Sequence, residues 1–290
     1  MADAAGAGSA ASAGGAKTLS VLQKKYDGLR ARFEQMDSAL IAFSAGVDST
    51  VLLKVAAEAL GDKVAAVTAR SCFEPQREID EAQEFCEDEG IRHFVVDIDP
   101  LAIEGVTSNP PDRCYLCKRK LFRRFKEIAA EHGYAHVCDG SNASDQGEYR
   151  PGRRAIEELG VESPLLELGF EKDEVRVLGM SLGIPNWSKP SFSCLATRFT
   201  TGSTITSEAL AMVDRAEQLL FDAQFDQVRV RMHEVGSGRY LARVEVGADE
   251  MDDLYELASD TYFVQQMHKM GFEFVTFDLD GYRAGSANLL

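Results

Sequence analysis

The sequence has no run of 18 or more apolar residues, so it predicts no helix that spans a membrane. It is also short of positive charge: 31 Lys and Arg face 47 Asp and Glu, a formal net charge of −16 at pH 7. A broad nucleic-acid surface needs many cations to displace phosphate counterions, so we expect no nucleic-acid partner. A local cationic pocket is still compatible with this charge. The first residues lack the basic and apolar regions of a secretory signal.

Histidine and cysteine are both scarce. The five histidines show no metal-ligand spacing. Six cysteines in a 290-residue chain without a secretory signal favour reduced thiols over a disulfide framework. The expected compartment is therefore the cytoplasm. Three of these cysteines fall on an expected helix or after expected strands and are interpreted as packing residues: Cys72, Cys86 and Cys138.

Strand and helix patterns alternate in the first two thirds of the chain. Residues 1–17 are a leader of small residues that we expect to be disordered. Four apolar strand patterns then alternate with helical ones: "ALIAFS", "KVAAVTARS", "IRHFVVDID" and "YAHVCDGSN". This alternation predicts parallel βαβ units, hence an α/β domain with a doubly wound, mainly parallel sheet over residues 18–203.

The pattern changes near residue 204. A helical pattern over 206–221 precedes two alternating strands, "DQVRVRMH" and "GRYLARVEV". A further helix over 249–270 and a strand in "FEFVTFDLDGYR" complete the set. We therefore expect a smaller C-terminal α+β domain over residues 204–290.

The segment "IAFSAGVDST" has the form of an anion-binding loop. An apolar strand ends at Ser44 and a helix opens near Asp48, so backbone N–H groups and the helix N-terminus converge on one point. Asp48 offers a carboxylate for a helix cap or for Mg²⁺. The loop contains no Walker A lysine, and a well-capped strand–turn–helix is the alternative interpretation. The candidate nucleotide-binding residues are Ser44, Ala45, Gly46, Val47, Asp48, Ser49 and Thr50.

This loop resembles the SGGxDS loop of the PP-loop ATP pyrophosphatases, with Ala45 where that family usually has glycine. The substitution is costly if the position needs a positive φ. The resemblance implies that ATP is cleaved between its α and β phosphates, with Mg²⁺ offsetting the charge of the pyrophosphate. It leaves the acceptor open, since the superfamily includes amidation, thiolation and ligation.

Four later motifs extend the comparison: "DGSNASDQGEYRPGRRA", "SPLLELGFEKDEVRVLG", "KPSFSCLATRF" and "FVTFDLDGYRAGSANLL". Together they resemble the LarE family of ATP-dependent sulfur transferases, which serve nickel-pincer nucleotide biosynthesis and lactate racemization. The similarity spans residues 19–290. It implies adenylation of a carboxylate of pyridinium-3,5-dicarboxylate mononucleotide, after which sulfur replaces AMP to give a thiocarboxylate. It also implies a homo-oligomer built partly through the C-terminal domain.

The cysteines divide that family into two branches. Sulfur is delivered at the cysteine that matches Cys194, which in one branch gives up its own sulfur. In the other branch three cysteines hold a [4Fe–4S] cluster, and the CxxC of that branch matches Cys114 and Cys117. From the residues alone, a zinc site, a redox dithiol or two inert cysteines stay open. The resemblance favours the cluster, with Cys114, Cys117 and Cys194 as its ligands.

A nucleotide with a phosphate and carboxylates needs local cations. Arginine suits bidentate contact with both groups, so we predict that arginines bind the substrate, with surface arginines or salt bridges as the alternative. The candidates are Arg198, Arg229, Arg231 and Arg283. Arg198, together with Cys194 and Asp48, is also a candidate catalytic residue. The turn "EPQRE" is a candidate adenine contact. Competing functions are tRNA thiolation, ammonia-dependent amidation and non-catalytic nucleotide binding.

Overall fold

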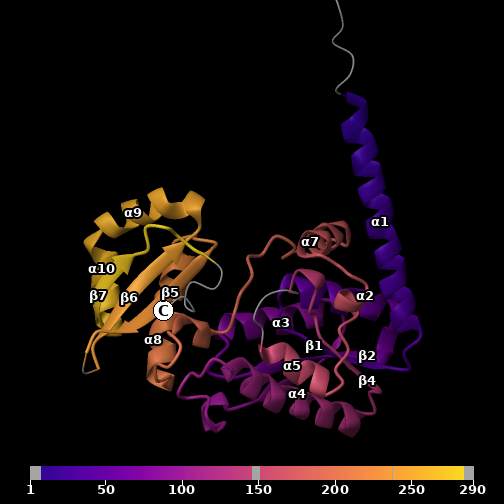
Figure 1. Cartoon of the computed structure of the whole chain (residues 1–290), viewed down its shortest axis with the longest axis horizontal. Helices are drawn as coiled ribbons and strands as arrows, with labels where there is room; N and C mark the ends of the chain where they lie inside the picture. The colour runs from indigo at the N-terminus through magenta and orange to yellow at the C-terminus, as the bar shows by residue number, and fades with distance from the viewer. Residues whose placement is uncertain (1–7, 146–150, 237, 284–290) are drawn as a thin grey trace, which may run out of the picture.

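The computed structural model of the chain describes residues 8–145, 151–236 and 238–283 (Figure 1). Its larger part contains a sheet of four strands, all parallel. They are β1 (Ala39–Ala42), β2 (Val64–Arg70), β3 (Arg92–Asp97) and β4 (His136–Cys138). The order across the sheet is β3-β2-β1-β4. The four predicted strands are thus confirmed.

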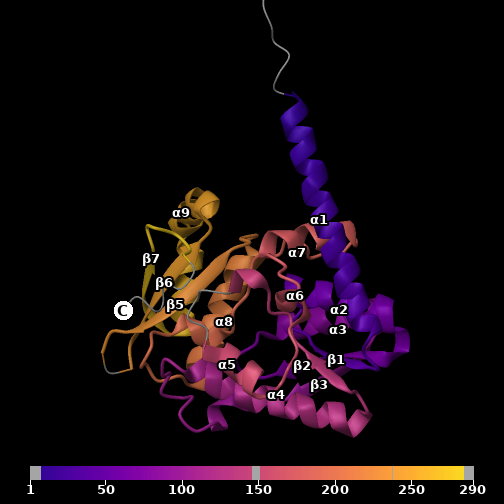
Figure 2. The ribbon, with the colours of Figure 1, turned by 45° about the vertical axis from the view of Figure 1, so that its right-hand side comes forward.

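Helices cover both faces of this sheet (Figure 2). On one face, Ile41 and Ala66 share a core with α1 (Gly8–Glu34), α2 (Val47–Leu60), α3 (Gln76–Asp88) and α7 (Lys172–Ser181). On the other face, Leu40 and Val67 pack against α4 (Arg113–His132) and α5 (Pro151–Glu158). Short helix α6 (Pro164–Glu167) leads into α7. The predicted doubly wound α/β fold is therefore confirmed.

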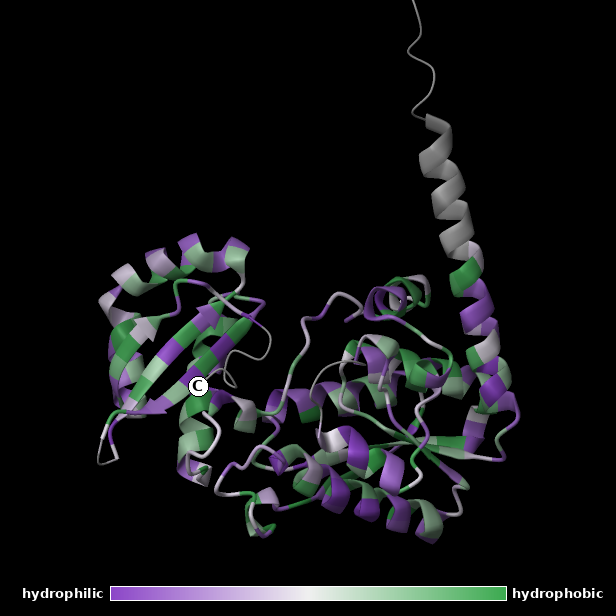
Figure 3. Ribbon diagram, in the orientation of Figure 1, coloured by the Kyte–Doolittle hydropathy of each residue, from purple (hydrophilic) through white to green (hydrophobic). Residues whose placement is uncertain are grey.

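The hydropathy of the elements explains this layering. Figure 3 shows hydrophobic residues over the central strands and hydrophilic residues along the outer side of α4. Strand β2 is buried over its first five residues, as a parallel strand covered on both faces should be. Among the residues that the structure describes, no helix is long and apolar enough to cross a membrane.

The start of the chain differs from the prediction. Helix α1 begins at Gly8, whereas we expected the leader to be disordered through residue 17. Alanine has the highest helix propensity, and the alanine-rich end of the leader continues the helix predicted downstream of it. The first seven residues of the leader lie outside the described residues.

The C-terminal part has its own three-stranded sheet, in the order β5-β6-β7. Strands β5 (Val228–Glu234) and β6 (Tyr240–Val246) are antiparallel, and β7 (Phe272–Phe277) runs parallel to β6. Helix α8 (Ser207–Asp222) packs on this sheet. The single helix predicted over 249–270 is wrong: α9 (Met251–Ser259) and α10 (Thr261–Met270) are separated at Asp260, which is extended and caps α10 by accepting the Tyr262 N–H.

The apolar core of the C-terminal sheet continues into the first part of the chain. Val230 and Val244 share one cluster with Phe73, which follows β2, and with Leu195. The segment around Cys194 therefore lies where the two parts of the chain meet. The predicted domain boundary at residue 204 remains a prediction.

Candidate active site

The turn between β1 and α2 has an unusual backbone. Ala45 has a φ of +53°, while Gly46 is extended with a φ of −76°. A positive φ brings the Cβ of an L-residue close to its own backbone, which explains why a glycine suits this position better than alanine. The carbonyl of Ala45 accepts a hydrogen bond of 2.8 Å from the Asn186 side chain. A distant segment thus holds the turn in this shape.

We predict that Ala45→Gly stabilises the protein slightly. Relief of the left-handed backbone is worth about 1–2 kcal/mol, whereas the lost methyl group, which is buried, costs about 0.8 kcal/mol. The net gain is about 0.5 kcal/mol on these figures. The matched control is Ala57→Gly within α2, which should destabilise by about 1 kcal/mol. Denaturant unfolding measures both, and equal losses in the two variants would contradict the strain argument.

Hydroxyl groups brace the inside of the turn. The Ser44 N–H donates to Ser49 Oγ at 3.3 Å, and the hydroxyls of Ser49 and Thr50 both donate to the Gly46 carbonyl, at 3.0 and 2.9 Å. Thr50 and Val47 are buried, so their side chains shape the turn rather than face a ligand. The N–H groups of the first turn of α2 have no acceptor inside the helix. These N–H groups are the natural contacts of an anion at this turn.

The loop that follows β4 closes on the same turn. A Cβ added to Gly140 would lie 2.9 Å from the Ser49 backbone nitrogen, so the two backbones are in direct contact. Asn142 donates a hydrogen bond of 2.9 Å to Asp48 Oδ1. Burial raises the pKa of the Asp48 carboxyl, and the Asn142 bond opposes the rise. Helix α2 follows β1 and helix α5 follows β4, and these two helices pack on opposite faces of the sheet. Ligands of doubly wound sheets bind where the chain changes faces in this way.

Arg113, at the first turn of α4, lies beside Cys114 and binds the segment that follows Cys194. Its buried guanidinium donates to the Asn109 side chain at 2.5 Å and to the Ala196 carbonyl at 2.7 Å, and it lies 3.5 Å from Cys114 Sγ. Burial acts to lower the pKa of Arg113, but the negative charges of Cys194 and Cys114 in their thiolate forms raise it above its usual value. Arg113 therefore joins the CxxC helix to the Cys194 segment.

The thiols of this group influence one another. Burial raises the pKa of Cys194 to about 11, with Arg113 opposing the rise, and the pKa of Cys117 to about 12, with the charge of Cys194 as the next cause. A bound metal cation turns coordinating thiols into thiolates. We call Cys114, Cys117 and Cys194 the cysteine group; all three are free and partly buried.

The donor chemistry of the cysteine group bears on the cluster that the resemblance implies. In the described part of the chain, no three His, Cys, Asp or Glu side chains converge closely enough to hold one metal ion. A [4Fe–4S] cluster differs because each thiolate binds a different iron, so its ligands are spread apart. Three free thiols are the type of donor that such a cluster takes, and the Arg113 guanidinium, beside Cys114 Sγ, would balance part of its negative charge.

One carboxyl group beside the cysteines was missed as part of this site. The sequence predicted only that the turn containing Glu74 would lie near adenine. Glu74 follows β2, accepts a hydrogen bond from Ser71, and its charge raises the pKa of both Cys117 and Cys194. Burial raises the pKa of Glu74 itself to about 7. The ends of parallel strands meet at one edge of a sheet, and this rule was the available signal.

Arg198 is fully buried and engaged by the protein. Its guanidinium forms two bonds to the Glu217 carboxylate, at 2.8 and 2.9 Å. It also donates to the carbonyls of Ser193 and Cys194, at 2.6 and 3.3 Å. These contacts hold the backbone on both sides of the Cys194 side chain. The geometry supports a positioning role for Arg198, and its predicted contact with substrate remains untested.

Of the three other arginines predicted to bind substrate, two are buried and one is exposed. Arg229 donates to the carbonyl of Ser191, and burial lowers its pKa to about 10. Arg231 forms a 2.9 Å salt bridge with Glu245, the alternative that the sequence left open for it. Arg283 is exposed and pairs with Asp280 at 2.9 Å. Their roles as substrate ligands remain predictions, since both buried guanidinium groups already have protein partners.

The chain is similar to several known proteins. Residues 38–109, which include the phosphate-type turn, match the family model of the queuosine biosynthesis protein QueC. The pyridinium-3,5-bisthiocarboxylic acid mononucleotide synthase of Lactiplantibacillus plantarum is 35% identical over 93% of this chain and 96% of its own length. An uncharacterised protein of Synechocystis is 41% identical over 92% and 98%. A component of the glutamine-hydrolysing GMP synthase of Methanococcus maripaludis is 30% identical over 59% and 57%.

The chain has a parallel sheet with this phosphate-type turn between neighbouring strands whose helices cover opposite faces. This fold and the family match place it in the class of PP-loop enzymes, which use ATP. Within that class, the chain belongs to the LarE family, because its similarity to the Lactiplantibacillus synthase runs through nearly the whole of both chains. It is an ATP-using, sulfur-transferring enzyme.

Proposed function

We propose that the chain uses ATP to adenylate a carboxylate of pyridinium-3,5-dicarboxylate mononucleotide and then replaces AMP by sulfur, giving a thiocarboxylate for a nickel-pincer nucleotide. The observation that carries this proposal is the path of the segment before Cys194. Asn186 binds the Ala45 carbonyl of the phosphate turn at 2.8 Å, and Leu195 N–H binds the Phe73 carbonyl at 2.8 Å. A nucleotide site and a sulfur site are thereby connected by one short segment.

The adenylation step follows from the chemistry of the turn. A substrate carboxylate oxygen attacks the α-phosphorus of ATP, the bond from that phosphorus to the bridging oxygen breaks, and pyrophosphate departs with the electron pair. The free N–H groups of α2 would hold the pyrophosphate, as helix N-termini hold anions. Asp48 is the proposed Mg²⁺ ligand. One of its oxygens is bound by Asn142, and its partly buried carboxylate suits a hard cation.

The sulfur step is assigned to the cysteine group. A [4Fe–4S] cluster held by Cys114, Cys117 and Cys194 would supply a sulfide from its open iron. The chain's own contribution is positional and electrostatic: Arg113 balances negative charge, and Arg198 fixes the backbone at Cys194. Sacrifice of the Cys194 sulfur is the competing route, and tRNA thiolation is disfavoured by the charge of −16.

We also propose a cytoplasmic location and a homo-oligomer. All six cysteines are free, as expected in a reducing compartment. Exposed apolar side chains on the C-terminal part, Tyr255, Tyr262 and Phe274, offer a surface for a second copy of the chain.

The test follows products in the full-length protein after anaerobic purification. We expect one pyrophosphate and one AMP for each thiocarboxylate formed. Asp48→Asn should lower the rates of pyrophosphate release and thiocarboxylate formation together, by about 100-fold, because the Mg²⁺ ligand is lost. The matched control is Asp62→Asn at an exposed position, which should leave both rates unchanged. Thiocarboxylate formed without pyrophosphate release would refute the proposed chemistry.

A further inference from the structure

One side chain from a distant segment is bound to the phosphate turn, residues 44–50. Asn186 Nδ2 donates a hydrogen bond of 2.8 Å to the Ala45 carbonyl, across 141 positions of sequence. Because only the amide nitrogen can donate, this partner fixes which end of the amide faces the turn. Among the described residues, the other end, Asn186 Oδ1, is buried and has no hydrogen-bond partner. A buried acceptor without a partner costs stability, so stability alone does not explain this asparagine.

The segment that carries Asn186 is fixed from two sides. The Asn186 carbonyl accepts the Lys189 N–H at 2.9 Å. Lys189 forms a 2.8 Å salt bridge with Glu78 of α3. A Cβ added to Gly179 of α7 would lie 3.3 Å from the Trp187 Cβ, so the segment is in direct contact with α7. Because α3 and α7 both hold the segment, it can fix the position of the turn.

The bond to the Ala45 carbonyl also sets the direction of the next N–H. Ala45 and Gly46 are joined by a trans peptide, in which the carbonyl and the following N–H point in opposite directions. The Gly46 N–H therefore points away from Asn186. In the described part of the chain, this N–H has no acceptor. Like the N–H groups of the first turn of α2, it is a donor available to a ligand.

The residue at position 45 makes this arrangement depend on Asn186. The φ of Ala45 is +53°, in the left-handed region that alanine adopts at a cost and glycine does not. Without the bond from Asn186, relaxation of Ala45 to a negative φ would rotate the following peptide and turn the Gly46 N–H aside. A glycine at position 45 would lack this tendency. The contribution of Asn186 should therefore be larger beside alanine than beside glycine.

We propose that Asn186 is a positioning residue for the ATP step: it holds the peptide between Ala45 and Gly46 so that the Gly46 N–H binds the β and γ phosphates of ATP. The placement of these phosphates in the turn rests on the proposed function. Donors that are fixed before the ligand arrives need no reorganisation, and they stabilise the pyrophosphate as it departs. Asn186 acts through the peptide and needs no contact with ATP.

Calorimetry on the full-length protein tests this role, with α,β-methylene-ATP and Mg²⁺ as the probe. A methylene group replaces the oxygen whose bond would break, so the analogue binds without reacting. Asn186→Leu keeps the approximate size of the side chain and removes its donor. We expect the Kd of the analogue to rise about 10-fold, as for one charge-assisted hydrogen bond to phosphate. An unchanged Kd would overturn the proposal.

Two controls accompany this variant. AMP lacks the β and γ phosphates, so its Kd should equal that of the parent, which also shows that the variant is folded. An equal loss for AMP and for the analogue would overturn the positioning role. Ser188→Ala changes an exposed side chain of the same segment and should bind both ligands as the parent does.

A second substitution tests whether Asn186 acts through the turn. In Ala45→Gly/Asn186→Leu the backbone strain is absent, so the Kd of the analogue should lie within about 3-fold of the value for Ala45→Gly alone. A loss as large as that caused by Asn186→Leu in the parent would show that Asn186 acts in some other way and would overturn the proposal.

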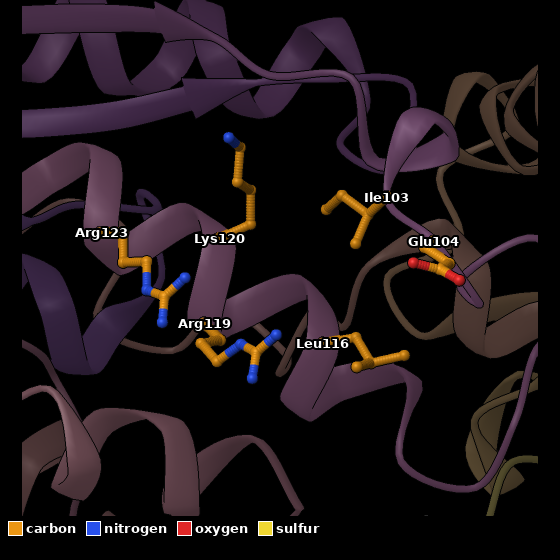
Figure 4. A pocket seen from close by; sticks show the side chains of 6 residues that line it. All are labelled: Ile103, Glu104, Leu116, Arg119, Lys120 and Arg123. Carbon is orange, nitrogen blue, oxygen red and sulfur yellow. The ribbon is translucent and has the colours of Figure 1, made fainter.

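A cationic cavity elsewhere is a competing site for the analogue. This cavity, of about 380 Å³, lies beside α4 with Arg119, Lys120 and Arg123 in its lining, and its lining includes no residue of the phosphate turn (Figure 4). Lys120→Gln/Arg123→Gln should leave the Kd of the analogue unchanged. A loss equal to that in Asn186→Leu would place the analogue in this cavity and overturn the assignment. No measurement here involves sulfur or the substrate carboxylate, so failure of the proposed sulfur chemistry would leave these results unaffected.

Discussion

Replacement of Cys194 by alanine is expected to abolish sulfur transfer while the adenylation step continues. The thiol belongs to the cysteine group and takes no part in the bonds that shape the phosphate turn. Thiocarboxylate formation should fall at least about 1000-fold, as for loss of a group that acts directly on the reacting atoms, while pyrophosphate release stays within a few fold. Both products are measured in the same reaction by mass spectrometry and by pyrophosphate assay.

A control variant and a double variant distinguish the cluster route from the sacrificial route. Cys86→Ala removes a buried thiol on α3 that packs in the core, so it should keep both rates. Cys114→Ala/Cys117→Ala should lose sulfur transfer as completely as Cys194→Ala if the three thiols hold one cluster. If that double variant instead makes one thiocarboxylate per chain and converts Cys194 to dehydroalanine, the cluster proposal is wrong and the sacrificial route is correct.

The sheet and the phosphate turn could be predicted because their signals are local. Each strand is a short apolar run, and the strand–turn–helix of residues 39–60 needs only neighbouring residues to form. Even the cost at Ala45 followed from the identity of one residue, and its φ of +53° bears this out. The error at α9 and α10 also has a local cause. Asp260, which caps α10, was interpreted as part of one longer helix.

The arrangement around the cysteines could not be obtained in this way. Arg113 reaches the Ala196 carbonyl across 83 positions of sequence, and no local pattern indicates that contact. Basic residues flank the CxxC on both sides, yet of these Arg113 is the buried one, beside the Cys114 thiol, while Lys120 is exposed. Salt bridges were only the alternative interpretation for Arg198 and Arg231, and there is a physical reason. An arginine in a motif suggests a ligand, and its carboxylate partner is recognised only when the fold is known.

Removal of the Arg198 guanidinium is expected to have the largest effect on stability. Arg198 and Glu217 are both fully buried, and Glu217 Oε1 also accepts the Val230 N–H of β5 at 2.9 Å. Arg198→Met leaves this carboxylate without its main counter-charge, so the free energy of unfolding should fall by about 3–5 kcal/mol. Urea unfolding of the full-length protein measures the loss. Arg124→Met, which breaks a surface pair, should cost less than about 1 kcal/mol.

A double variant tests whether the charge pair itself, rather than side-chain volume, determines this loss. Arg198→Met/Glu217→Leu removes both charges and keeps apolar volume, so it should be clearly more stable than Arg198→Met alone. Its sulfur transfer should nevertheless be impaired, because the bonds from Arg198 to the Ser193 and Cys194 carbonyls are gone. A double variant that regains both stability and the full rate of sulfur transfer would show that Arg198 does not position Cys194. Arg198→Met within about 1 kcal/mol of the parent would show that the buried pair is not what secures this segment.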